Sequence, residues 1–426
     1  MTPWLIWSEE EGPRVVYAIT ETLRLAGVQQ VQWAKHPQEL ISFEGNTLLY
    51  ATSQVFPSTC FIPSSGFLSE TGIKKFEVPV GRWHDLLVLF PMQADWGFDL
   101  FAAVFFCLSR YEEYTASQRD AFGRFDARAS WAFQNNVLTR PVVDEWLNEW
   151  RNGYLSNEKV EAEPQIKFNW SYDIDVAYAW KGKSFLRSVY AQLQHIKEVG
   201  MKGVFSTKDP LDVYDEIQSC CSGQLAKPSF FLLAAKQLND LDRNIQRHST
   251  AFLNLIKRLQ IIGQIGWHVS SQAAHNYSIA KEEKAYLEKI MGPITATRMH
   301  YISLQIPTTY QMLVELGIRE DYSMGYATMQ GLRASTHQSF YWYDLQNDSA
   351  TELLIHPFVY MDANAIFEEK QDADSAEVFI RSFIDRAEQL LVQPHLVFHS
   401  HFITEEKEFR QWRSLHQRIL SMNDRN

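Results

Sequence analysis

The stretch Lys167-Phe168-Asn169-Trp170-Ser171-Tyr172-Asp173-Ile174-Asp175 places two acids directly after a short apolar segment that is typical of a buried strand. Short strands continue to alternate with amphipathic helices to the end of the chain. We expect the strands at 167–172, 229–234, 264–268, 300–305, 352–357 and 395–398. The helices are expected at 184–198, 251–260, 278–289, 308–316 and 374–392. This alternation predicts an α/β fold with a mostly parallel sheet, closed as a (β/α) barrel.

The chain before this stretch has a different pattern, in which short apolar runs alternate with turns rich in Gly, Pro and Ser. The pattern predicts two strands and two helices, at 48–50, 86–91, from Asp99 onward and at 142–150. The polar stretch 152–165 is the best candidate for a linker. The sequence therefore predicts two domains, a smaller N-terminal α/β domain over 1–160 and a barrel over 161–426.

Charge and cysteine content narrow the class of protein. The 426 residues include 40 Lys and Arg against 51 Asp and Glu, which gives a formal net charge of −11. This balance, with no basic run, argues against nucleic acid or an anionic membrane as a partner. Four cysteines, two of them adjacent, do not make a disulfide framework. The N-terminus does not resemble a signal peptide, and no apolar run is long enough to span a membrane. We therefore expect a cytoplasmic protein, and its oligomeric state stays open.

Acids, imidazoles and a guanidinium group fall at the ends of several predicted strands. Asp173 and Asp175 are two residues apart, so on a strand they face the same side. Two close carboxylates do not both ionise readily unless a cation lies between them. His268, at the end of another strand, is a suitable second metal ligand. Alone, an Asp-x-Asp is usually a solvated turn and a lone His a core residue, but together they favour a divalent metal site.

Four segments carry a resemblance to a known family, and their order matters more than any one of them. They are Ser171-Tyr172-Asp173-Ile174-Asp175, His268-Val269-Ser270, Arg298-Met299-His300-Tyr301 and Leu396-Val397-Phe398-His399. Together they resemble the motifs of the polysaccharide deacetylase family, carbohydrate esterase family four, over about residues 166–405. The resemblance implies a distorted (β/α) barrel of the polysaccharide deacetylase type. The N-terminal part resembles an uncharacterised domain that accompanies a subgroup of these deacetylases.

One position departs from the family pattern. The second motif would place another histidine at position 272, where this chain has Gln272. His300 lies two residues from Arg298 on a predicted strand and would face the same way, so we favour it as the third ligand. His275 is the alternative, although on a helix it would lie about 10 Å further along than His268. A site with no third protein ligand also stays open.

The family resemblance implies hydrolysis of an N-acetyl (or O-acetyl) group on a saccharide. A divalent metal, with Zn²⁺ the expected ion, would be held by Asp175, His268 and His300. It would lower the pKa of a bound water, from which Asp173 would take the proton. Arg298 would hold Asp173 ionised, and the backbone N–H of Tyr301 would stabilise the oxyanion.

The same resemblance assigns protonation of the leaving amine to His399, with His401 and His356 as second choices. Aromatic residues make up 14% of the chain; we expect most of them to fill the core between sheet and helices, and some near the motifs could stack on sugar rings. The candidates for stacking are Tyr172, Trp267, Tyr301, Tyr326 and the cluster 340–343.

Two other functions compete with the deacetylase. Gln272 favours a catalytically inactive relative that binds saccharide or acts as a scaffold. A C–N hydrolase that acts on a small amide would use the same metal chemistry.

Overall fold

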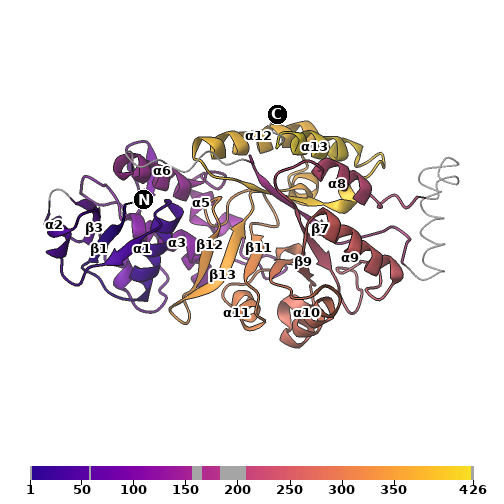
Figure 1. Ribbon diagram of the computed structural model, residues 1–426, viewed down its shortest axis with the longest axis horizontal. Helices are drawn as coiled ribbons and strands as arrows, with labels where there is room; N and C mark the ends of the chain where they lie inside the picture. The colour runs from indigo at the N-terminus through magenta and orange to yellow at the C-terminus, as the bar shows by residue number, and fades with distance from the viewer. Residues whose placement is uncertain (1, 57–58, 156–165, 183–207, 424–426) are drawn as a thin grey trace. The chain divides into compact units, whose positions relative to one another are not determined.

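The computed structural model describes residues 2–56, 59–155, 166–182 and 208–423 (Figure 1). The chain forms two compact units. The first comprises Met1–Glu163, Gln305–Gln311 and Leu332–Ile355, and the second Pro164–Leu304, Met312–Gly331 and His356–Asn426. The predicted helix 184–198 and most of the predicted linker lie outside the described residues. In the described ranges, no helix is both long and apolar enough to cross a membrane.

The first unit is built on a four-stranded parallel sheet of order β2-β1-β3-β4. Its strands are β1 (Trp4–Ser8), β2 (Val31–Trp33), β3 (Asn46–Ala51) and β4 (Cys60–Pro63). Parallel neighbours need a crossover, which α1 (Pro13–Leu25) supplies between β1 and β2. The remaining elements are α2 (Glu39–Ser42), the hairpin β5 (Val80–Trp83) and β6 (Leu86–Leu89), α3 (Leu100–Leu108), α4 (Tyr111–Thr115), α5 (Trp131–Gln134) and α6 (Val142–Tyr154). Asp99 starts α3 because its side chain accepts a hydrogen bond from the Ala102 N–H.

The larger sheet has nine strands in the order β12-β13-β11-β10-β9-β8-β7-β15-β14. They are β7 (Asn169–Ile174), β8 (Ser229–Leu233), β9 (Gln264–Val269), β10 (Ala296–Met299), β11 (Glu320–Met324), β12 (Phe340–Asp344), β13 (Ser349–Pro357), β14 (Tyr360–Met361) and β15 (His395–His399). The seven strands β11, β10, β9, β8, β7, β15 and β14 pair in parallel in that spatial order. The other two, β12 and β13, form an antiparallel hairpin. β12 and β14 stand at the two ends of this order and do not pair with each other in the described residues. The sheet is therefore curled but open, a half-barrel where the sequence predicts a closed barrel.

Helices surround the parallel strands of the second unit (Figure 1). They are α8 (Tyr214–Cys221), α9 (Thr250–Ile262), α10 (Tyr277–Met291), α11 (Thr308–Glu315), whose last residues belong to this unit, α12 (Ala373–Gln389) and α13 (Arg410–Ser421). The start of α9 is fixed by Ser249, whose hydroxyl accepts a hydrogen bond from the Phe252 N–H. Buried residues of α9 recur at helical spacing, which gives it one apolar face. The four helices predicted from residue 251 onward are confirmed as α9, α10, α11 and α12.

One predicted strand is wrong. Residues 300–305 do not continue the sheet, because β10 ends at Met299 and residues 300–302 form a 3₁₀ turn. Tyr301 and Ile302 have φ values of 55° and 50°, in the left-handed region that a strand cannot contain. The apolar alternation of this segment imitates a strand. His300 therefore reaches the site from a turn, and the expectation that it shares a strand face with Arg298 was mistaken.

Candidate metal centre

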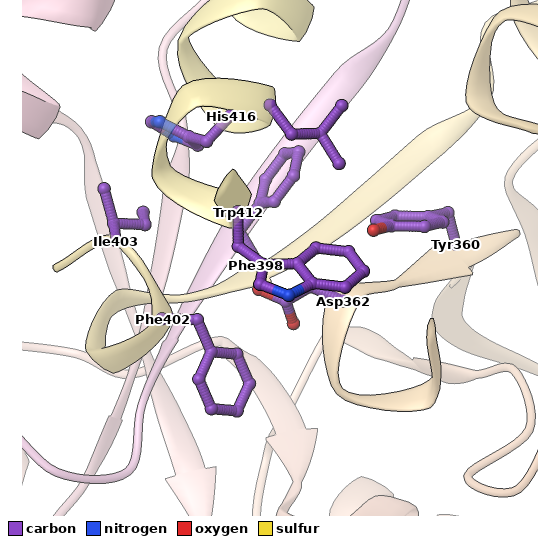
Figure 2. A pocket seen from close by; sticks show the side chains of 8 residues that line it. Tyr360, Asp362, Phe398, Phe402, Ile403, Trp412 and His416 are labelled. Atoms are coloured by element: carbon purple, nitrogen blue, oxygen red, sulfur yellow. The ribbon is translucent and has the colours of Figure 1, made fainter. Parts of the chain in front are cut away.

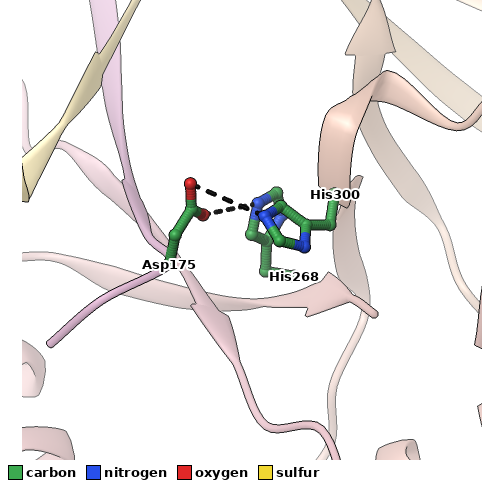
Figure 3. A group of neighbouring side chains, drawn as sticks. All are labelled: Asp175, His268 and His300. Atoms are coloured by element: carbon green, nitrogen blue, oxygen red, sulfur yellow. Dashed lines mark ion pairs between the residues drawn. The ribbon is translucent and has the colours of Figure 1, made fainter. Parts of the chain in front are cut away.

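Three side chains from the ends of three strands of the larger sheet meet in the second unit (Figure 3). Asp175 directly follows β7, His268 is on β9, and His300 directly follows β10. One potential ligand atom from each lies within 4.8 Å of the others. Nε2 of His268 is 3.0 Å from Oδ1 of Asp175, and Nε2 of His300 is 3.6 Å from Oδ2 of the same carboxylate. The parallel register brings them together, because carboxyl ends of parallel strands share one edge of the sheet.

The outer nitrogen of each imidazole has an acceptor of its own. Nδ1 of His268 lies 2.9 Å from the carbonyl oxygen of Arg298, and Nδ1 of His300 lies 2.9 Å from Oδ1 of Asp242. A carbonyl or carboxylate oxygen only accepts, so each Nδ1 carries the hydrogen. In a neutral ring this leaves the Nε2 lone pair directed toward Asp175. A hydrogen-bonded outer nitrogen is the usual arrangement of a metal-binding histidine.

The charge balance at this point fits a cation. Oδ1 of Asp175 is buried and accepts no hydrogen bond from any described residue, although Nε2 of His268 is close. Burial opposes the charge on His300, but Asp175 and Asp242 raise its pKa to about 9. Burial likewise opposes the charge on Asp175, yet His300, His268 and His399 hold its pKa well below its ordinary value. A divalent ion bound to one carboxylate oxygen and two imidazole nitrogens would satisfy these groups.

Asp173 lies beside this cluster but is engaged differently. Its Oδ1 accepts a hydrogen bond of 2.7 Å from Nη1 of Arg298, and both side chains are almost fully buried. Arg298 also donates from Nε to the carbonyl oxygen of Tyr322, and its guanidinium lies 4.4 Å from the ring centre of Phe231. Oδ2 of Asp173 is left facing the histidines, 3.8 Å from Nε2 of His268. The arginine thus fixes which oxygen of Asp173 is turned toward the site.

His399 is the last residue of β15, which pairs with β7 on the side away from β8. It pairs in register with Asp173 across β15 and β7, and its Nε2 lies 3.9 Å from Oδ2 of Asp173. Asp362 holds it from behind, with Oδ1 2.5 Å from Nδ1 and Oδ2 accepting the backbone N–H of His399 at 2.7 Å. Burial opposes the charge, but Asp362, Asp175 and Asp173 raise the pKa of His399 to about 9. The imidazole is therefore a proton carrier held in a fixed direction.

Asp362 also lines a small, mainly apolar pocket (Figure 2). Asp362 is its one acid, and the remaining lining residues are Tyr360, Phe398, Phe402, Ile403, Trp412, Leu415 and His416.

The other histidines considered from the sequence have different positions. His275 is on a 3₁₀ turn (Ala273–His275) and is not part of the cluster. His356 lies 3.1 Å from Glu320 and stacks on Tyr322. His401 has its ring centre 5.5 Å from that of His399, and burial lowers its pKa to about 4. Of the two alternatives for the third ligand, the geometry favours His300.

Most aromatic residues proposed for sugar stacking are in the core. Tyr172 and Trp267 are fully buried, and Tyr326 and Trp342 nearly so, so their ring faces are not accessible. That part of the expectation is wrong, because the apolar rings pack inside the sheet and helix layers. Tyr301 is 40% exposed, and its ring lies 4.2 Å from that of His300. It is the candidate that remains beside the cluster, while its backbone N–H as an oxyanion donor stays a prediction.

The sequence assigned no role to two carboxylates at the site, although it placed the segment 361–364 beside the cleft. Asp242 lies in the loop between β8 and α9, and Asp362 directly follows β14. Both hold the outer nitrogen of a histidine that is distant in the sequence. Asp242 lies in a short polar loop of a composition that is common on protein surfaces, and the sequence next to Asp362 does not indicate its partner His399.

Residues 4–155 match the model of a family of unknown function (DUF7033). No curated protein matches the chain. Among solved structures, the chain is similar to a "putative polysaccharide deacetylase" from Mycobacterium smegmatis, with 12% sequence identity and a TM-score of 0.40. This similarity covers 62% of the present chain and 88% of the other. It is too distant to indicate an activity, so the function has to be inferred from the residues themselves.

Proposed function

We propose that this protein is a metal-dependent hydrolase that removes N-acetyl (or O-acetyl) groups from a saccharide. The observation that carries the proposal is the position of Asp173, a carboxylate paired with buried Arg298 and facing both the Asp175–His268–His300 cluster and His399. A metal-binding group, a base and an acid at one sheet edge are the parts that amide hydrolysis needs. The order of the four motifs, which resembles the polysaccharide deacetylase family, adds the substrate class.

Asp175, His268 and His300 would hold the ion, and one carboxylate with two imidazoles is a donor set that suits Zn²⁺. When bound, such an ion polarises an acyl carbonyl and lowers the pKa of water. The chain's own residues then have distinct tasks on either side of the acyl group.

Asp173 would act as the base. Oδ1 is occupied by Arg298, so Oδ2 would accept the proton as water adds to the acetyl carbon. The Arg298 pair also prevents rotation of the carboxylate, which keeps Oδ2 toward the cluster. The backbone N–H of Tyr301 is the proposed donor to the oxyanion.

His399 would act as the acid. Its Nδ1 is held by Asp362, so Nε2 would deliver a proton to the leaving nitrogen or oxygen as the bond to the acetyl carbon breaks. The products are acetate and the free amine or hydroxyl. The lowered pKa of His401 supports His399 for this task, because a group with a pKa of about 4 carries no proton to donate near neutral pH.

The test is acetate release from acetylated chito-oligosaccharides by the wild type and Asp173→Asn. We expect Asp173→Asn to lose activity by about 10²- to 10⁴-fold, the usual contribution of a general base, with metal content and folding unchanged. Asp321→Asn, a change at another buried acid of the same sheet, should retain activity. Acetate release by Asp173→Asn at the wild-type rate would refute its role. A metal-loaded wild type that releases no acetate from N- or O-acetylated saccharides would refute the substrate class.

A further inference from the structure

The third side chain of the cluster is His300. The motif pattern described above would instead place a histidine at position 272, where this chain has Gln272. We propose that Asp242 is the positioning residue that makes His300 a metal ligand. The inference rests on the proposed metal-dependent function and assigns the construction of its site. It concerns a carboxylate from the β8–α9 loop, outside all four motifs.

Asp242 is itself held firmly. It is fully buried, and its Oδ1 accepts hydrogen bonds from the Ser271 N–H at 3.0 Å and from Nδ1 of His300 at 2.9 Å. Its Oδ2 accepts the Ser271 hydroxyl at 2.6 Å and the Asn239 amide at 3.2 Å. Four donors around one carboxylate leave it little freedom to rotate. A fixed acceptor fixes the ring of His300 in turn, with Nδ1 protonated and Nε2 toward Asp175.

A second contact ties the same two loops together. The Tyr301 hydroxyl donates to the carbonyl oxygen of Leu241, so consecutive residues after β10 meet consecutive residues after β8. Because Tyr301 has a positive φ, the chain turns sharply here and could not hold His300 by strand pairing. The loop carrying Asp242 therefore supplies the orientation that the sheet does not.

Ser271 connects this arrangement to the second motif. It lies three residues after His268 and one before Gln272, and it contributes two of the four hydrogen bonds to Asp242. The second motif, which has Gln272 in place of a second histidine, thus contributes Ser271 to hold Asp242, and Asp242 in turn holds His300. His268 and His300 then lie with ring centres 4.9 Å apart, close enough to share one ion with Asp175.

The chain offers a matched control for Asp242. Asp321 on β11 is also fully buried, and it accepts the Ser323 N–H at 2.9 Å, the Ser323 hydroxyl at 2.8 Å and the Thr297 hydroxyl at 3.2 Å. Its serine contacts reproduce those of Asp242, but it is not one of the carboxylates that hold the cluster. Asp321→Asn therefore reports the effect of neutralising a buried, serine-capped carboxylate in the same sheet.

The experiment is a Zn²⁺ titration of the metal-stripped protein against a chromogenic chelator. The variants are Asp242→Asn, His300→Ala, the double variant and Asp321→Asn, with folding followed by circular dichroism. We expect Asp242→Asn to weaken Zn²⁺ binding by about 10- to 100-fold, as is typical for an outer partner of a metal ligand. In the His300→Ala background the same change should have no further effect, because Asp242 acts through His300. Asp321→Asn should bind as the wild type does.

Several outcomes would overturn the proposal. Wild-type affinity in Asp242→Asn, or equal weakening with and without His300, would remove the role of Asp242 while leaving the metal-dependent function intact. Equal weakening in Asp321→Asn would also remove it. Absence of Zn²⁺ binding by the wild type would refute both. If Asp242→Asn does not fold, Ser271→Ala keeps the carboxylate and loosens it, and a weakening of about two- to tenfold is expected; unchanged affinity in that variant would count against the proposal.

Discussion

Acids lie at the end of the first strand of each unit, and the two acids nearest each strand end are in different states. Glu9 and Glu10 follow β1, and Asp173 and Asp175 lie at the end of β7. Glu9 accepts hydrogen bonds from the N–H and hydroxyl of Thr52, and Glu10 accepts the hydroxyls of Ser64 and Ser69. Asp175, by contrast, is surrounded by imidazole nitrogens and has an oxygen that accepts no hydrogen bond from the described residues.

The partners of these carboxylates distinguish a candidate metal site from an ordinary polar turn. Hydroxyls and backbone N–H groups donate to a carboxylate and satisfy it. Imidazoles whose hydrogen is directed outward present lone pairs to the carboxylate instead when the rings are neutral, and a cation between the carboxylate and the rings then stabilises both. The residues that face the acids therefore decide the chemistry, more than the acids themselves.

The largest effect is expected from removing a carboxylate of the second unit. Asp175→Ala should lower Zn²⁺ affinity by several hundred-fold or more, since a structural zinc site is worth about 10–16 kcal/mol and three protein ligands share it. Glu10→Gln should leave the affinity unchanged, because Glu10 is satisfied by hydroxyls of its own unit. Metal content after dialysis, measured by emission spectroscopy, checks both. Stoichiometric metal in Asp175→Ala would remove the distinction between the two pairs.

Buried charge in the first unit is expected to act on stability instead. Glu113 is fully buried and receives hydrogen bonds from Arg110 at 2.8 Å and from both Nε and Nη2 of Arg333. Glu113→Gln leaves these guanidinium groups without their shared carboxylate. We expect a loss of about 3 kcal/mol in the free energy of unfolding, the lower end for breaking a buried pair, because Glu112 still accepts from Arg110. Urea unfolding measures this, and Zn²⁺ affinity should not change.

The same glutamate predicts a dependence on pH. Burial opposes its charge, but Arg333 and Arg110 lower the pKa of Glu113 from 4.5 to about 2. A lowered folded-state pKa means that the carboxylate stabilises fully above pH 4.5 and that this contribution is lost as pH falls toward 2. Between pH 4.5 and 3 the stability difference between wild type and Glu113→Gln should shrink by about 2 kcal/mol. Urea unfolding at the two pH values tests this, and a constant difference would contradict it.

Much of the fold follows from the sequence because its determinants are local. Alternating apolar segments locate the strands β7, β8, β9, β13 and β15 to within three residues. Asp173, Asp175 and His268 stand out because polar residues at the ends of buried strands are unusual. Their approach to one another follows from parallel strand order alone.

What the sequence does not reveal depends on contacts between distant segments. Asp242 and His300 are 58 residues apart, Asp362 and His399 are 37 apart, and Arg333 and Glu113 are 220 apart. Nothing in the composition of these segments indicates the pairing. The turn at His300 was missed for another reason, since Tyr301 adopts a positive φ without the glycine that usually marks one. Burial of Tyr172 and Trp267 likewise depends on packing that the aromatic content cannot show.

The smallest effect is expected from changing Asp362, an acid of the second unit that we expect to influence the reaction without binding the metal ion. Asp362 contacts His399 through Nδ1 and the backbone N–H, and it is outside the cluster of potential ligands. Asp362→Asn should lower kcat for acetate release by about tenfold, near the lower end of the 1.5–3 kcal/mol of a charge-assisted hydrogen bond, because an amide oxygen can still accept from Nδ1. Zn²⁺ affinity should stay at the wild-type value. If affinity fell together with kcat, His399 would belong to the metal ligands, and the separation between holding the ion and moving the proton would have to be redrawn.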